Sequence, residues 1–221
     1  MNYLSHFIID FKPGEHYFNG ALILPDIAKR WIKTFHHPNP SPFFTPNQQL
    51  LLQGCLSHYA RDKQFHASSF FERYQHIANE TLRSMPFSEN VQRKWFIAHV
   101  LTELMIDRAF VKKFPHLVDS FYESLNLIDD IQLSGFLNHY GMTDTNDFFT
   151  FFNHFRSVKY IYYYADNNKF LYSLGRIMMR VGLNDFNDED GQLMLNAITQ
   201  IESNNLSDGE ALLTELKEVF K

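Results

Sequence analysis

The chain has 221 residues, of which 45% are hydrophobic and 16% aromatic, so it can bury a core of ordinary domain size. Its formal net charge is -5 with no basic block, which argues against nucleic acid and anionic membranes as partners. Cys55 is the only cysteine, which excludes a disulfide framework and indicates a reducing compartment.

The N-terminal segment does not resemble a targeting signal. The first ten residues, MNYLSHFIID, lack the basic start and the long apolar run of a signal peptide. No window approaches the roughly 20 apolar residues needed to cross a bilayer. We therefore expect a cytoplasmic protein, and the composition favours no particular oligomeric state.

The first part of the chain predicts short helices. Residues 2–11 have the pattern of an amphipathic helix. Residues 16–33 are helical again, and Pro25 is expected to kink that helix or to start a new one. Asp26 follows the proline directly, where a carboxylate suits the first turn of a helix.

A proline-rich loop comes next, at residues 36–46, HHPNPSPFFTP. We expect a surface loop or a lid there rather than a linker between domains, because little chain precedes it. Thr45 and Pro46 suit the cap and first turn of a helix over residues 46–66. Residues 67–84 continue the helical pattern after a bend.

The remaining chain is also helical in pattern. Ser88 predicts the cap of a helix over residues 89–113. Shorter helical pieces follow from Pro115, and residues 159–182 predict one broken helix. Strand alternation and internal repeats are absent from the sequence, which therefore predicts an all-α fold in a single domain, residues 1–221.

Two of these predicted helices carry possible metal ligands at intervals of four residues. The six side chains are His58, Asp62 and His66 on the first helix, and His99, Glu103 and Asp107 on the second. Four residues turn an α-helix by about 40° beyond one full turn, so each series lies along one face. The second series lies among apolar residues, and a buried carboxylate costs several kcal/mol unless it is paired or bound to a metal. These helices therefore need compensating partners.

A metal site would supply those partners. Imidazole and carboxylate groups bind Zn, Mn, Fe and Mg ions, and helical bundles build such sites from facing helices. His6 and Asp26, each in an apolar segment, are candidates to complete the ligand set. Two other interpretations remain: a non-catalytic helical protein with a buried polar network, and a redox-active metal-binding bundle. The paired Glu-x-x-His motifs of ferritin-like di-iron proteins are missing, which counts against the latter.

Four short motifs occur in order within the first 110 residues: MNYLSHF, NGALILPDI, GCLSHYARD and LMIDRAF. Together they resemble the acyl carrier protein phosphodiesterase family, a distant branch of the HD-type metal-dependent phosphohydrolases. The first motif is similar to that family's MNFLAHL and places His6 on its histidine. The second resembles Gly-Asn-Leu-Leu-x-Asp-Phe and places Asp26 on a metal-site aspartate. The third resembles Gly-x-x-x-His-Arg-x-x-Asp and matches His58 and Asp62, and the fourth places Asp107 in register with a later aspartate.

Three positions depart from the family pattern. Leu56 stands where the family has a further histidine, His66 where it has an aspartate, and Arg108 where it has a histidine. His99 and Glu103 have no counterpart in the motifs. These changes keep a plausible set of metal ligands but alter its composition.

The resemblance implies an enzyme that hydrolyses a phosphodiester and releases 4'-phosphopantetheine from holo acyl carrier protein. It also implies a divalent metal, with Mn first and Fe, Mg or Zn as other candidates. The expected partner is acyl carrier protein or another small phosphodiester. The metal ligands would be His6, Asp26, His58, Asp62 and Asp107.

Three further side chains would act in catalysis as proton carriers or would complete the ligand set: His66, His99 and Glu103. A basic patch of Lys29, Arg30 and Lys33 beside Asp26 would have to offset the acidic net charge when an acidic carrier protein binds.

Overall fold

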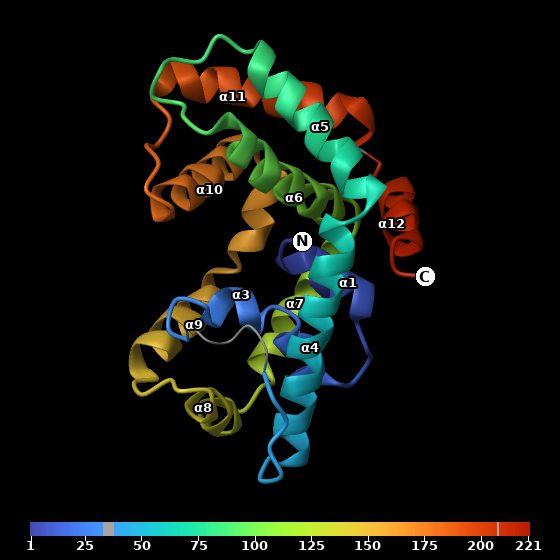
Figure 1. Cartoon of the computed structure of the whole chain (residues 1–221), viewed down its shortest axis with the longest axis vertical. Coiled ribbons are helices and arrows are strands. Elements are labelled where there is room, and N and C mark those ends of the chain that lie inside the picture. Colours follow the sequence, from blue (N-terminus) through green and yellow to red (C-terminus); the bar gives the residue numbers. More distant parts are fainter. Residues whose placement is uncertain (33–37, 207) are drawn as a thin grey trace. The chain divides into compact units, whose positions relative to one another are not determined.

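The computed structural model confirms the all-α fold class. It describes residues 1–32, 38–206 and 208–221, and this part of the chain contains helices and irregular segments but no strand (Figure 1). Within it, no helix is long and apolar enough to span a bilayer.

The described chain divides into two compact units, each made of separate segments. The first unit comprises Met1, Tyr3–Lys63 and His116–Tyr160, and the second comprises Asn2, Gln64–Pro115 and Ile161–Lys221. The prediction of a single domain stays a prediction.

The first unit consists mainly of six helices and most of a seventh. They are α1 (Tyr3–Asp10), α2 (His16–Ala21), α3 (Leu24–Ala28), α4 (Pro46–His66) as far as Lys63, α7 (Pro115–Asn126), α8 (Asp130–His139) and α9 (Asn146–Val158). The core between them is rich in phenylalanine.

Local sequence signals account for several of these boundaries. The helix predicted over residues 46–66 is α4 with the same bounds. Pro25, expected to kink the helix of residues 16–33 or to start a new one, lies in the first turn of the separate helix α3, where its missing N–H costs nothing. In the predicted loop 36–46, residues 38–45 contain no helix, whereas residues 36 and 37 lie outside the described residues.

Gly54 allows α4 to pack closely against α2. A Cβ atom at Gly54 would lie 2.4 Å from the carbonyl oxygen of Phe18 and 2.7 Å from Cβ of Ala21. Only glycine permits this approach without a shift of the backbone. One turn further along α4 stands His58, so this contact sets the distance of that histidine from the end of α2.

The second unit contains the remaining helices. They are α5 (Ser69–Ser84), α6 (Lys94–Lys113), the 3-10 helix η1 (Tyr160–Ala165) from Ile161 on, α10 (Asn167–Arg180), α11 (Asp188–Ile201), the π-helical turn η2 (Glu202–Leu206) and α12 (Gly209–Glu218). Helix α5 packs on α6, and α11 packs along α5, as Figure 1 shows. Residues 159–182 form a broken helix, η1 and α10, as predicted, whereas α11 has no counterpart among the predicted elements.

The prediction that Ser88 caps a helix starting at residue 89 is wrong. Helix α6 begins at Lys94, after Arg93 in a left-handed conformation with φ of 50°. Ser88 instead donates two hydrogen bonds to Asp190 at the start of α11, from its backbone N–H at 2.8 Å and from Oγ at 2.6 Å. Ser88 thus binds a residue 102 positions away in the sequence and does not cap α6.

Helix α6 is largely buried, as its apolar pattern predicted. Arg108 is 2% exposed and donates to the carbonyl oxygen of Tyr164 at 2.6 Å and to Oε1 of Glu202 at 3.2 Å. Asp107, beside it in the chain, accepts a hydrogen bond from Nδ2 of Asn2 at 2.8 Å. The buried arginine is thus paired with a carboxylate of η2.

Candidate metal centres

The structure brings six of the eight predicted site residues into two separate groups of three. The first-unit cluster is His6, Asp26 and His58, and the second-unit cluster is His66, His99 and Glu103. In each cluster, one possible ligand atom from every member lies within 4.8 Å of the others. Among the described residues, neither Asp62 nor Asp107 belongs to such a group.

The first-unit cluster joins three helices of that unit. His6 comes from α1, Asp26 from the first turn of α3 and His58 from α4. The two imidazole rings are buried and stacked, with centroids 4.0 Å apart and planes inclined by 23°. The Asp26 carboxylate is partly exposed and accepts from Nζ of Lys29 at 3.2 Å.

A hydrogen bond fixes the orientation of His58. Its Nδ1 lies 2.8 Å from the carbonyl oxygen of Leu22, the residue that directly follows α2 and caps it. A helix end leaves its last carbonyls without partners inside the helix, so this oxygen is available as an acceptor. Since a carbonyl can only accept, Nδ1 carries the proton and Nε2 of neutral His58 has the lone pair. Metal-binding histidines are held by the same kind of bond.

The surroundings keep His58 neutral and Tyr59 protonated. Burial lowers the pKa of His58, although Asp26 and the Leu22 carbonyl act in the opposite direction. Burial also raises the pKa of Tyr59 well above its ordinary value, with the charge of Asp26 adding to the effect. A neutral imidazole is the form that binds a metal ion.

Asp62 lies beside the first-unit cluster, one turn after His58 on α4. Its Oδ1 is 2.6 Å from the amino group of Met1 and 3.8 Å from Nε2 of His6. It is therefore held at the edge of the cluster by a positive charge. The predicted role of Asp62 as a ligand stays a prediction.

An ion pair holds α1 against α4 next to this cluster. Arg61 donates from Nε and from Nη2 to the carboxylate of Asp10, both at 3.0 Å, and Ser57 donates from Oγ to the same carboxylate at 2.5 Å. These three residues lie at the end of α1 and on the turns of α4 that flank His58. They keep His6 in register with His58.

The second-unit cluster is built on the end of α4 and the middle of α6. Nε2 of His66 and Nε2 of His99 each lie 3.3 Å from Oε1 of Glu103. The two rings are stacked with centroids 4.9 Å apart and planes inclined by 12°. Phe71 of α5 meets both rings edge-on, at 4.6 Å from His66 and 5.0 Å from His99.

Glu103 is ionised in this setting. Burial alone would raise the pKa of its carboxyl group, but the hydrogen bond from His99 and the charge of His66 are among the interactions that lower it below its ordinary value. Gln75 of α5 approaches from the far side, with Nε2 at 3.4 Å from Nδ1 of His99. The half-buried carboxylate thus has the compensating partners that the sequence required.

The donor atoms of both clusters suit a small divalent cation, because imidazole nitrogen and carboxylate oxygen are its usual ligands. In both clusters the imidazole planes are nearly parallel, so the lone pairs do not yet converge on one point. Binding an ion therefore requires one ring to turn about its Cβ–Cγ bond. In the first-unit cluster that ring is His6, since Leu22 holds His58.

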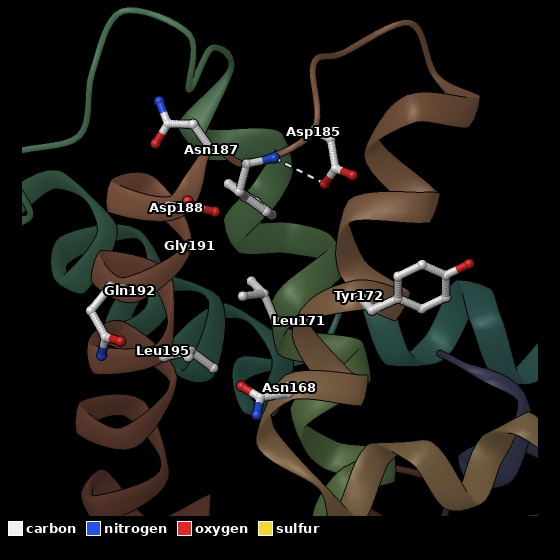
Figure 2. Close-up of a pocket in the computed structure, with 10 residues that line it drawn as sticks. Asn168, Leu171, Tyr172, Asp185, Asn187, Asp188, Gly191, Gln192 and Leu195 are labelled. Carbon is white, nitrogen blue, oxygen red and sulfur yellow. Dashed lines mark hydrogen bonds between the residues drawn. The ribbon is translucent and has the colours of Figure 1, made fainter.

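A pocket of about 300 Å³ lies elsewhere in the second unit, between α10 and α11 (Figure 2). Polar and aromatic side chains line it, among them Tyr172, Asp185, Asn187 and Gln192. None of the predicted site residues and no histidine contributes to its lining. The pocket therefore adds nothing to the metal chemistry of the two clusters.

No family model, curated protein or solved structure matches this chain.

Two supporting groups lie outside the sequence prediction. The Leu22 carbonyl is a backbone atom, and its role depends on the close approach at Gly54. Phe71 looks like an ordinary core residue of an amphipathic helix. No local sequence signal identifies either of them.

Proposed function

We propose that the protein is a metal-dependent phosphodiester hydrolase whose metal site is the first-unit cluster. The observation that carries this proposal is the bond between Nδ1 of His58 and the Leu22 carbonyl, which leaves Nε2 as the nitrogen of His58 that could bind an ion in the group with His6 and Asp26. The resemblance of the four sequence motifs supports the same three residues. We take Mn²⁺ as the first candidate, with Fe, Mg or Zn as alternatives.

The chemistry at such a site requires few residues. A divalent ion bound there would lower the pKa of a coordinated water and offset the charge of the phosphoryl oxygens. His6 and His58 would hold the ion through nitrogen, and Asp26 would add a negative charge at the exposed side. Asp62, whose Oδ1 lies 3.8 Å from Nε2 of His6, would accept the proton of the attacking water in this proposal.

The roles proposed for the other predicted site residues are separate from this cluster. His66, His99 and Glu103 form their own group, and their predicted function as proton carriers stays a prediction. Asp107 is bonded to Asn2, and its predicted function as a ligand also stays a prediction.

The substrate we propose is holo acyl carrier protein or another small phosphodiester. Lys29 and Arg30 are exposed near Asp26 and supply positive charge for an acidic carrier, whereas Lys33 of the predicted basic patch lies outside the described residues. Arg30→Glu should lower the rate on the carrier protein by a larger factor than the rate on a small phosphodiester. An equal loss of rate on both substrates would show that Arg30 does not bind the carrier protein.

The direct test of the reaction uses bis-p-nitrophenyl phosphate. Metal-free protein is assayed alone and after addition of Mn²⁺, Mg²⁺, Fe²⁺ or Zn²⁺. We expect hydrolysis only with metal, and a loss of at least about 100-fold in His58→Ala. Protein that binds none of these ions and hydrolyses nothing would instead support the non-catalytic polar network.

A further inference from the structure

The second-unit cluster is a compact arrangement that the proposed reaction does not use. It holds two imidazoles and one carboxylate, His66, His99 and Glu103, all on described helices of one unit. Its side chains are 30%, 35% and 18% exposed, so solvent and ions can reach them. We propose that this cluster is a second metal site, one that binds Zn²⁺, independent of the first.

The distances between the donor atoms match the coordination of zinc. Zinc binds histidine nitrogen at about 2.0–2.1 Å and carboxylate oxygen at about 2.0–2.2 Å, so two ligands of a tetrahedral ion lie about 3.3–3.5 Å apart. Oε1 of Glu103 lies 3.3 Å from Nε2 of each histidine. Two edges of the tetrahedron are therefore formed before an ion binds.

The third edge of the tetrahedron joins Nε2 of His66 to Nε2 of His99, and it requires one of these rings to turn. The planes of His66 and His99 are inclined by only 12°, so their Nε2 lone pairs do not meet. His66 is enclosed by Phe65 and Phe71, with ring centroids 5.2 Å and 4.6 Å away. His99 is the more exposed of the two, and its Nδ1 faces the side chain of Gln75 at 3.4 Å. We therefore assign the movement to His99.

Gln75 supplies the outer support that a metal-bound histidine needs. Its amide group faces Nδ1 of His99 at 3.4 Å. When the amide turns by half a revolution, its Oε1 accepts a hydrogen bond from Nδ1–H of His99, which leaves Nε2 of His99 for the metal. The metal-bound and metal-free forms then differ by two small side-chain rotations.

The donor set of the second-unit cluster suits Zn²⁺. Two imidazoles and one carboxylate with an open fourth position form the ligand set of catalytic zinc enzymes. Sites containing nitrogen donors bind Zn²⁺ more tightly than Mn²⁺, and they leave Mg²⁺ and Ca²⁺ to all-oxygen sites. The exposed side of the cluster leaves room for water in the open position. Zn²⁺ bound there would face solvent through that water.

The test is a zinc titration of metal-free full-length protein by calorimetry, with matched variants. His99→Ala removes one ligand, and Glu103→Gln removes one while keeping the shape of the side chain. His58→Ala disables the first-unit cluster alone. His76→Ala is the control, because His76 is an exposed histidine of α5 outside both clusters. Circular dichroism and urea unfolding establish that each variant is folded.

We expect one equivalent of Zn²⁺ that persists in His58→Ala and His76→Ala. Its affinity should fall by at least about 100-fold in His99→Ala and Glu103→Gln, the upper limit of what outer-sphere changes cause. Co²⁺ gives an independent readout, since its visible absorption at this site should persist in His58→Ala and disappear in Glu103→Gln. If His99→Ala fails to fold, the zinc affinity of Glu103→Gln alone tests the proposal.

Three results would overturn the proposal: wild-type affinity in Glu103→Gln, loss of the same equivalent in His76→Ala, or loss of all bound zinc in His58→Ala. The proposed hydrolase fails by different measurements, because it depends on His58. If the wild-type protein hydrolyses no phosphodiester but His58→Ala still binds zinc, the proposed hydrolase is wrong and the zinc site of the second-unit cluster stands.

Discussion

Nδ1 of His58 and the carbonyl oxygen of Leu22 lie 2.8 Å apart, and this contact determines which nitrogen of His58 is available to a ligand. The acceptor is the end of α2, and the donor is on α4 one turn after the close approach at Gly54. A packing contact between two helices therefore defines the chemistry of the first-unit cluster.

Gly54→Ala tests that packing contact. The new Cβ would be 2.4 Å from the Phe18 oxygen, and α2 and α4 must move apart to accept it. We expect a loss of about 1–3 kcal/mol in the free energy of unfolding. Urea unfolding measures the change, and metal affinity should fall with it because His58 moves away from Leu22.

Gly135→Ala is the matched control. A Cβ there would meet only the end of the Gln48 side chain, at 2.8 Å, which can move. Since alanine is favoured over glycine in a helix by up to about 1 kcal/mol, α8 should be unchanged or slightly stabilised. Equal losses in both variants would show that the contact at Gly54 has no special importance.

The acid sensitivity of the fold should depend on His58. Burial lowers the pKa of folded His58 below that of the unfolded chain, so acid protonates the unfolded state first. The free energy of unfolding does not depend on His58 protonation above about pH 6.5. Below that pH it falls as the pH approaches the pKa of folded His58, by up to about 1.4 kcal/mol per pH unit. Urea unfolding across this range, in the presence of a chelator, measures the slope.

His58→Gln should make that slope shallower, because glutamine can still donate to Leu22 but does not titrate. The exposed His76→Gln should keep the wild-type slope. An unchanged slope in His58→Gln would mean that other groups produce the acid sensitivity.

The ion pair of Arg108 and Glu202 should stabilise the second unit strongly. Arg108 is 2% exposed, and removing it leaves Glu202 and the Tyr164 carbonyl without this donor. We expect Arg108→Ala to cost about 3–5 kcal/mol, as for other broken buried pairs. Lys112 contacts the same carboxylate but is 39% exposed, so Lys112→Ala should cost less than about 1 kcal/mol. Similar losses in both variants would contradict the buried role of Arg108.

The helices themselves follow from the sequence. The pair Thr45 and Pro46 marks the start of α4, and the pattern of residues 159–182 indicated a broken helix. The start of α6 does not follow, because Ser88 binds Asp190 through a contact that no local pattern reveals. The boundary within residues 16–33 follows from Pro25, which lies in the first turn of α3.

The candidate sites follow from the sequence in part. The motifs identified His6, Asp26 and His58, and the structure brings these three together. Spacing by four residues predicted that each series lies on one face of its helix, but not that its members bind the same ion. Each step of four residues also advances about 6 Å along the helix axis. Sharing a face therefore did not decide which residues meet. The separation into two clusters depends on tertiary contacts such as those of His66 and His99 with Phe71.

The most direct test of the account is Mn²⁺ binding to metal-free protein, measured from the electron paramagnetic resonance signal of the remaining free ion. Wild type, His58→Ala and His76→Ala are compared in parallel, each shown to be folded. We predict that wild type and His76→Ala bind Mn²⁺ with the same affinity and that His58→Ala binds it at least about 100-fold more weakly. Equal Mn²⁺ affinity in wild type and His58→Ala would contradict the assignment of the first-unit cluster as the metal centre.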